Sequence, residues 1–378
     1  MSGILKIALK LLVNDRSKFI ALLVGITFAV FLMIMMMSMF SGILSRSSAS
    51  VYNIGAKIWV MDPAVNNATS SIPMPDYVLS KTRSIDGVKY AVPIYFGNAL
   101  VKLKSGAYQA VSVVGLDDAT LYGRPELIEG KIEDIYAESA FFVVKDAEFK
   151  KLENPVIGTE FEINDHRGLV VGLAKVASGG LFGIPTVYTT YNRAITYIPS
   201  MRFTTSYVLI EPKSEADIPF IQQQVKKLGY QALTRDQFVG KISDFYTYQT
   251  GMGMNVLMMT AISFIVGLSI SGQTFYTFIL ENMERFGALK AIGAKGHELI
   301  AMILFQASFT ALLGYGIGVG LASGLMILAK LRLPSYAAQV TYFNLTFAFV
   351  MVLIMAGVSS YIGIRKVLQI QPFDIFRG

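Results

Sequence analysis

The residue types that most often carry out chemistry are scarce in this chain. It has no cysteine and two histidines, His166 and His297. Thiolate metal sites and thiol nucleophiles are therefore excluded, as is a metal site built from several histidines of one chain. The sequence predicts no catalytic residue, no metal site and no cofactor bound by this chain.

A glycine-rich segment at 314–324 has the composition of a phosphate-binding loop without its pattern. A P-loop reads G-x-x-x-x-G-K-[ST]. Neither Gly-Lys-Ser nor Gly-Lys-Thr occurs in the sequence, so no ATP hydrolysis by a P-loop is expected from this chain alone. Glycines four residues apart let membrane helices approach closely. This favours a helix-packing role for Gly314, Gly318, Gly320 and Gly324.

The most distinctive charged segment runs from residue 284 to 294. Its residues are Glu284, Arg285, Phe286, Gly287, Ala288, Leu289, Lys290, Ala291, Ile292, Gly293 and Ala294. Apolar and charged positions alternate as on a short amphipathic helix, and Gly293 is typical of a helix end. An ordinary charged loop is the simpler interpretation of the same residues.

Four apolar segments explain where these residues must lie. No Asp, Glu, Lys or Arg occurs in 19–45, 245–280, 299–329 or 333–364. Each segment exceeds the roughly 20 residues that a helix needs to cross a bilayer. A charge at mid-bilayer costs about 2.5–3.5 kcal/mol. We therefore predict a membrane protein with four transmembrane α-helices at 19–45, 252–280, 299–329 and 342–364, the second beginning after Gly251.

A large α+β extracytoplasmic domain, residues 46–250, is predicted between the first and second transmembrane helices. Strand–helix–strand patterns occur near both of its ends. They predict a membrane-proximal part, 46–115 plus 201–250, and an inserted subdomain, 116–200. The charged run 145–153 is expected to be a solvated helix face. Basic and acidic residues cancel in this domain, so the net charge of +7 comes from the flanks of the membrane helices and gives no indication of nucleic-acid binding.

Orientation follows from the short segments that flank the helices, because cytoplasmic loops carry excess Lys and Arg. One side has Lys6, Lys10, Arg16, Lys18, Arg285, Lys290, Lys295, Arg365, Lys366 and Arg377, whereas the other has Lys330 and Arg332. Both termini and the 281–298 loop are predicted to be cytoplasmic. Residues 1–18 are then an interfacial amphipathic helix, or an extension of the first span; 330–341 form an external loop and 365–378 a cytoplasmic tail. A cleaved signal peptide is disfavoured because its apolar region is shorter than 19–45.

The segment Leu289–Ala294 resembles the inner loop of the MacB/FtsX-like permeases of ABC transporters, a group that includes LolC/LolE and DevC. That family has an acidic–basic helix followed by apolar-basic-Ala-apolar-Gly-Ala. The order Glu284 then Arg285 departs from its usual Arg then Glu. The segment Gln371–Arg377 resembles the family's carboxyl end, and the layout of one span, an outer domain and three spans is similar over the whole chain.

The resemblance implies partners rather than catalysis. A cytoplasmic ABC ATPase would bind ATP and Mg and dock on residues 284–294, and two copies of the chain would form a dimer in a bacterial inner membrane. ATP-driven motion would pass to the periplasmic domain. The expected system is a DevC- or MacB-like tripartite efflux pump with a periplasmic adaptor and an outer-membrane channel. The alternatives are an FtsX-like switch of an extracytoplasmic enzyme, LolC/LolE-like lipoprotein release and, outside the family, a passive sensor or scaffold. The substrate is not predicted.

Overall fold

The chain forms two compact units in a computed structural model that describes residues 2–176, 183–198, 205–333 and 335–368. One unit, here called the helix bundle, contains Met1–Gly42, Met252–Arg332 and Ala338–Gly378. The other, here called the sheet domain, contains Ile43–Gly251 and Leu333–Ala337. Among the described residues, four helices are long and apolar enough to cross a membrane: α2 (Arg16–Ser47), α8 (Met252–Glu281), α10 (Gly296–Arg332) and α11 (Tyr342–Leu368).

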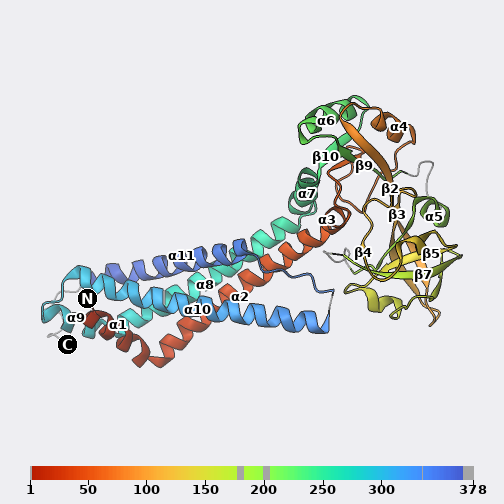
Figure 1. The fold of residues 1–378 in the computed structure, drawn as a ribbon. Coiled ribbons are helices and arrows are strands. Elements are labelled where there is room, and N and C mark those ends of the chain that lie inside the picture. Colours follow the sequence, from red (N-terminus) through yellow and green to blue (C-terminus); the bar gives the residue numbers. More distant parts are fainter. Residues whose placement is uncertain (1, 177–182, 199–204, 334, 369–378) are drawn as a thin grey trace. The chain divides into compact units, whose positions relative to one another are not determined.

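These long helices pack side by side through small and weakly polar residues (Figure 1). The Ser271 hydroxyl of α8 lies 3.2 Å from the Ser359 hydroxyl of α11. Asn344 of α11 is buried, and its side-chain amide donates to the Ser41 hydroxyl of α2 at 3.1 Å. Hydrogen bonds of this kind join helices in lipid, where a polar group without a partner is costly.

The amino-terminal helix α1 (Ser2–Asn14) ends earlier than the predicted 1–18 segment. Asp15 explains the break, since its carboxylate accepts the backbone N–H of Lys18 at 3.3 Å at the start of α2. Ala8 and Leu12 of α1 are buried, and Gln306 of α10 donates to the Ala8 carbonyl at 2.8 Å. One side of α1 is therefore fixed to the bundle.

The other helix boundaries also extend beyond the predicted spans. Helices α2, α10 and α11 run past 19–45, 299–329 and 342–364 because charged residues continue a helix outside the apolar segment. The predicted external loop 330–341 thus loses its first three residues to α10, and the predicted tail 365–378 loses its first four to α11. Helix α8 begins at Met252, after Gly251 with φ of +75°. Gln371–Arg377 lies outside the described residues.

The sheet domain contains ten strands and five helices among its described residues. The strands are β1 (Ile58–Met61), β2 (Val88–Lys102), β3 (Tyr108–Leu116), β4 (Glu126–Gly130), β5 (Ala140–Val144), β6 (Glu160–Ile163), β7 (His166–Lys175), β8 (Thr186–Thr190), β9 (Tyr207–Pro212) and β10 (Gln231–Thr234). The helices are α3 (Ala49–Ile54), α4 (Tyr77–Arg83), α5 (Tyr191–Tyr197), α6 (Ile218–Lys227) and α7 (Arg235–Asp244). Their mixture is the predicted α+β class.

The strands are ordered β10-β1-β9-β2-β3-β8-β5-β7-β4, and β6 pairs with β2 and β7. The β6–β7 hairpin turns at Asn164 and Asp165, both with positive φ, as a two-residue hairpin turn requires. The long strand β2 connects two regions of the sheet. Its first half pairs with β9 as far as Ile94–Tyr207, and its second half pairs with β3 from Tyr95–Gly115.

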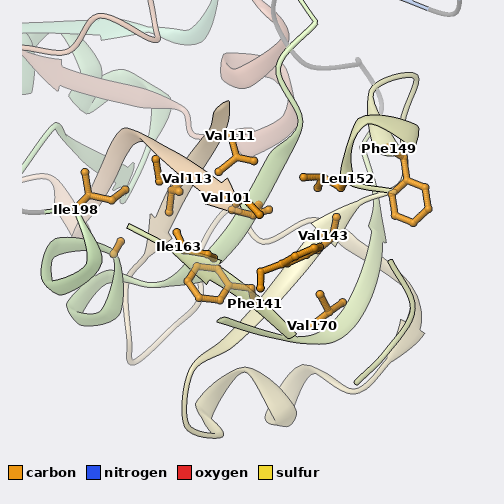
Figure 2. Close-up of a cluster of buried hydrophobic side chains, with 14 of the residues drawn as sticks. Val101, Val111, Val113, Phe141, Val143, Phe149, Leu152, Ile163, Val170 and Ile198 are labelled. Carbon is orange, nitrogen blue, oxygen red and sulfur yellow. The ribbon is translucent and has the colours of Figure 1, made fainter. Parts of the chain in front are cut away.

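Two hydrophobic cores match these two regions. One lies under α4 and α6 and contains Ile58, Val78, Val208, Ile221 and Val225. The other contains Val101, Val111, Val113, Phe141 and Val170 (Figure 2). The division therefore falls within β2, not at the expected residue 115/116 boundary, because strand β3 faces the second core. A strand of 15 residues is long enough to supply side chains to both.

The charged run 145–153 differs from the predicted solvated face. It forms only a short 3-10 turn, Phe149–Leu152, and Glu148 is 1% exposed. The Glu148 carboxylate lies 2.8 Å from the Lys151 ammonium and 3.8 Å from the Arg46 guanidinium. Arg46 belongs to the last turn of α2. This ion cluster ties the end of α2 to the sheet domain.

Candidate functional site

The candidate site is built on helix α9 (Met283–Ala291), which follows α8 after a sharp junction. Asn282 forms that junction and is 3% exposed. Its side-chain amide donates to the Phe278 carbonyl at 2.9 Å, and its side-chain oxygen accepts from the Arg285 guanidinium at 2.7 Å. Asn282 thus fixes where α8 ends and α9 begins. Asn282 lies outside the predicted segment 284–294, although asparagine is typical of helix ends.

Gly293 ends the helix. Its φ of +104° is accessible to glycine at little cost and strained for other residues. The Gly293 N–H donates to the Lys290 carbonyl at 3.1 Å, and the Ala294 N–H donates to the Leu289 carbonyl at 3.0 Å. This is the bonding expected at a helix end that is closed by a left-handed glycine. The next helix, α10, begins three residues later.

Helix α9 has one buried face and one exposed face. Phe286 and Gly287 are buried in the bundle. Glu284, Arg285, Ala288 and Ala291 are exposed, and Ile292, which follows them, is 81% exposed. We call these five exposed residues the α9 surface. It combines small apolar residues, one projecting apolar side chain, one acidic residue and one basic residue, which is a suitable surface for a protein partner.

Two further contacts connect the α9 region to the rest of the bundle. The Lys18 ammonium of α2 lies 3.0 Å from the Glu281 carboxylate at the end of α8. The Lys290 ammonium donates to the Leu368 carbonyl of α11 at 3.3 Å. A displacement of α9 would therefore act on the ends of α2, α8 and α11. Figure 1 shows α9 and α1 at the same end of the bundle.

The predicted docking residues differ in their exposure, and not all of them belong to the α9 surface. Leu289, Lys290 and Ala294 are partly exposed and border the α9 surface. Phe286 and Gly287, which the sequence also predicts to dock on the ATPase, are buried, and the Phe286 side chain is 0% exposed. Burial of a phenylalanine is favourable by about 1.5–3 kcal/mol, which is why this residue of an amphipathic helix faces inward.

The four predicted packing glycines also differ from one another. A Cβ at Gly314 would lie 2.7 Å from Ile26 of α2, and one at Gly318 would lie 2.7 Å from Val30 of α2. At Gly320 and Gly324, no described atom lies within 4 Å of such a Cβ. Gly320 and Gly324 therefore do not mediate helix packing within the described part of this single chain.

The chain was compared with known families and proteins. The family described as MacB-like periplasmic core domain matches residues 19–228, and that described as FtsX-like permease C-terminal matches residues 257–372. An uncharacterized ABC transporter permease of Mycobacterium tuberculosis (strain H37Rv) is 25% identical over 338 residues, which cover 87% of this chain and 86% of the relative.

A second relative contains more than a permease. The macrolide export ATP-binding/permease protein MacB of Campylobacter fetus is 22% identical over 326 residues, which cover 82% of this chain and 48% of MacB. Among solved structures, the periplasmic region of MacB from Actinobacillus actinomycetemcomitans has a TM-score of 0.38 and 10% identity, covering 51% of this chain and 96% of that one.

The first family match covers more than half of the chain and most of the sheet domain, while the second covers most of the last three membrane helices. The domain between the first and second membrane helices is accordingly extracytoplasmic. This multi-pass membrane protein belongs to the MacB/FtsX-like permeases of ABC transporters, whose work requires a partner ATPase.

Proposed function

We propose that this chain is the permease subunit of an exporter in a bacterial inner membrane, and that it transmits ATP-driven motion of a separate ATPase to its periplasmic domain. The observation that supports this proposal best is the α9 surface. It is a compact, partly apolar surface on a helix that follows α8 directly and is joined to α11 by the Lys290–Leu368 hydrogen bond. The end of α8 is in turn paired with α2 through Glu281 and Lys18. A passive anchor would have no use for such a surface.

The ATP and Mg that drive the motion are assigned to the partner. MacB is named as an ATP-binding and permease protein, and this chain aligns with about half of it. The sequence also lacks a P-loop. The docked ATPase would therefore supply the hydrolysis. With the ATPase in the cytoplasm, α9 and both chain termini are cytoplasmic, which agrees with the excess of Lys and Arg on that side.

Helices α2 and α8 flank the segment 43–251 of the sheet domain, and the chain passes into these two helices in different ways. Helix α2 is unbroken from Arg16 to Ser47, and Arg46 in its last turn pairs with buried Glu148. The segment before α8 has a π-helical turn, Phe245–Gln249, and then Gly251 in the left-handed region. An unbroken helix transmits displacement, whereas an interrupted one absorbs rotation. We propose that α2 transmits motion and that residues 245–251 act as a hinge.

The wider assembly follows from the same proposal. Two copies would dimerise and, together with a periplasmic adaptor and an outer-membrane channel, form a tripartite efflux pump of the MacB or DevC kind. Release of lipoproteins and activation of an extracytoplasmic enzyme use the same motion with another partner. Crosslinking from the sheet domain distinguishes them: capture of an adaptor supports the pump, and capture of a hydrolase supports the enzyme switch.

The motion itself is directly measurable because the chain has no cysteine. Val156→Cys in the sheet domain and Tyr342→Cys in the bundle replace strongly exposed residues and provide two unique labelling sites. Spin-label distances are measured on the complex with its ATPase, nucleotide-free and trapped with ATP. We expect the distance distribution to change upon ATP trapping. An unchanged distribution in a complex that hydrolyses ATP contradicts the proposal.

A further inference from the structure

A basic, partly apolar cavity lies next to the α9 surface and has no assigned role. Its volume is about 660 Å³, within the range of ligand sites. Lys10 of α1, Arg16 at the start of α2 and Arg285 of α9 line it, so three elements each contribute one cation. Ile7, Leu11 and Val13 of α1 supply apolar walls.

The three cations have no anionic partner in the part of the chain that the structure describes. None of the described residues lining the cavity is acidic. Of the nearby carboxylates, Asp15 accepts the Lys18 N–H and Glu281 pairs with the Lys18 ammonium at 3.0 Å. Glu284 is exposed and does not line the cavity. The Arg285 guanidinium donates to Asn282, a neutral amide. The charged side chains that line the cavity are therefore all basic.

The apolar wall narrows the choice of ligand. Ile7 is 42% exposed and Val13 is 45% exposed, on the side of α1 away from buried Ala8 and Leu12. A soluble anion would need the cations but gain nothing from these side chains. An amphiphile with an anionic head and acyl chains would satisfy both, since each buried CH₂ contributes about 0.8 kcal/mol.

The position along the membrane normal fits the same ligand. Arg16 is followed within three residues by the apolar segment 19–45, so the cavity lies at the level where α2 enters the hydrocarbon. Lipid headgroups occupy this level, and basic pockets at such positions bind anionic headgroups. We propose that this cavity binds an anionic glycerophospholipid of the adjacent leaflet, with the phosphate among Lys10, Arg16 and Arg285 and an acyl chain against Ile7 and Val13.

The site links α1 to α9 through a lipid, and its existence does not depend on the proposed export function. The test uses the full chain, purified in a mild detergent and delipidated. Native mass spectrometry then titrates dioleoylphosphatidylglycerol against dioleoylphosphatidylcholine. We expect phosphatidylglycerol to bind tightly and phosphatidylcholine not to. The double variant Lys10→Gln/Arg16→Gln should weaken phosphatidylglycerol binding about tenfold or more. Equal binding of both lipids overturns the proposal.

Four further measurements keep the result interpretable. Lys330→Gln/Arg332→Gln removes two cations from the other end of α10 and should leave lipid binding unchanged. If it weakens binding as much as Lys10→Gln/Arg16→Gln does, the lipid is attracted by the overall positive charge of the protein and not by this cavity. Ile7→Ser keeps every charge and should still weaken binding. Excess glycerol 3-phosphate should not displace the lipid, and full displacement would mark a soluble-phosphate site. If the variant Lys10→Gln/Arg16→Gln fails to insert into the membrane, Arg285→Gln takes its place. Because Arg285 lies on α9 and not on α1 or α2, its variant should weaken phosphatidylglycerol binding in the same way.

Discussion

Ile292 is the most exposed apolar side chain near α9, and its exposure follows from the fold. The left-handed Gly293 ends the helix immediately after it, so Ile292 projects at the end of the helix. Ile292 is 81% exposed and belongs to the surface on which we propose that the ATPase docks. We therefore expect its side chain to be buried in that interface and to contribute strongly to binding.

We expect Ile292→Asp to abolish or strongly reduce co-purification with the ATPase, because an anchor replaced by a charge costs about 2 kcal/mol or more. Val156→Asp makes a comparable change at a 65% exposed position of the sheet domain and should leave co-purification intact. Retention of the ATPase by Ile292→Asp would place the docking surface elsewhere.

Glu148 is a buried carboxylate whose two cations belong to different segments. The Lys151 ammonium lies at 2.8 Å and Arg46 at 3.8 Å, and both cations are partly exposed. Glu148→Gln would remove the negative charge that faces both cations. We expect a loss of about 1–3 kcal/mol, below the value for a fully buried pair because solvent screens the cations.

The measurement is thermal unfolding of the purified chain, with Glu153→Gln as control. Glu153 lies in the same run but is exposed, so its variant should unfold near the wild-type temperature. Identical unfolding of the two variants would show that the Glu148 cluster contributes no stability.

At the scale of elements, only some glycines of helix α10 lie against α2. A Cβ at Gly318 would lie 2.7 Å from Val30 and 2.9 Å from the Thr27 carbonyl, and that backbone atom has little room to move. A Cβ at Gly316 would have no described atom within 4 Å. Gly318 and Gly316 thus provide a test position and a control position in the same helix.

We expect Gly318→Ala to destabilise the bundle by about 1–3 kcal/mol through overpacking. Gly316→Ala should cause no loss, since alanine favours helix more than glycine by about 0.8–1 kcal/mol. Thermal unfolding in detergent measures both. Equal effects would mean that α2 and α10 do not meet at Gly318.

Helix α2 is the element proposed to transmit motion, and a proline tests its continuity. Leu44→Pro removes a helix hydrogen bond and clashes with the preceding turn, at a cost of about 3 kcal/mol or more. ATPase binding through α9 should persist, whereas the ATP-dependent change in label distance should be reduced or lost.

Leu44→Ala is the control, because it shortens the same side chain but leaves the helix intact. It should behave as the wild type in the distance measurement. An undiminished ATP-dependent change in the proline variant would exclude α2 as the route.

At the scale of the whole molecule, charge distribution sets the expected orientation. The sheet domain is extracytoplasmic, and the α9 surface is expected on the opposite side of the membrane. A single cysteine reports on sidedness, since the wild-type chain has none.

A membrane-impermeant maleimide should label Val156→Cys in intact spheroplasts. Ile292→Cys should react only after permeabilisation, although it is the more exposed side chain. Labelling of Ile292→Cys from outside would reverse the proposed orientation and exclude α9 as a cytoplasmic docking surface.

The sequence alone determined the class of this protein, because the bilayer imposes a simple requirement. Charge-free segments such as 19–45 must be helices, since lipid offers no partner for backbone N–H and C=O groups. The position of the extracytoplasmic domain and the family resemblance at 289–294 followed from the same linear pattern. A local signal, Gly251, also located the start of the second membrane helix.

Only the tertiary structure decided which side chains face inward. Phe286 and Ile292 are both apolar residues of one short segment, yet the first is buried and the second exposed. Likewise, Gly318 contacts α2 whereas Gly320 does not, and Glu148 is buried within an otherwise solvent-compatible charged run. Such differences depend on which elements distant in sequence pack together, and periodicity along one helix or strand carries no information about its neighbours.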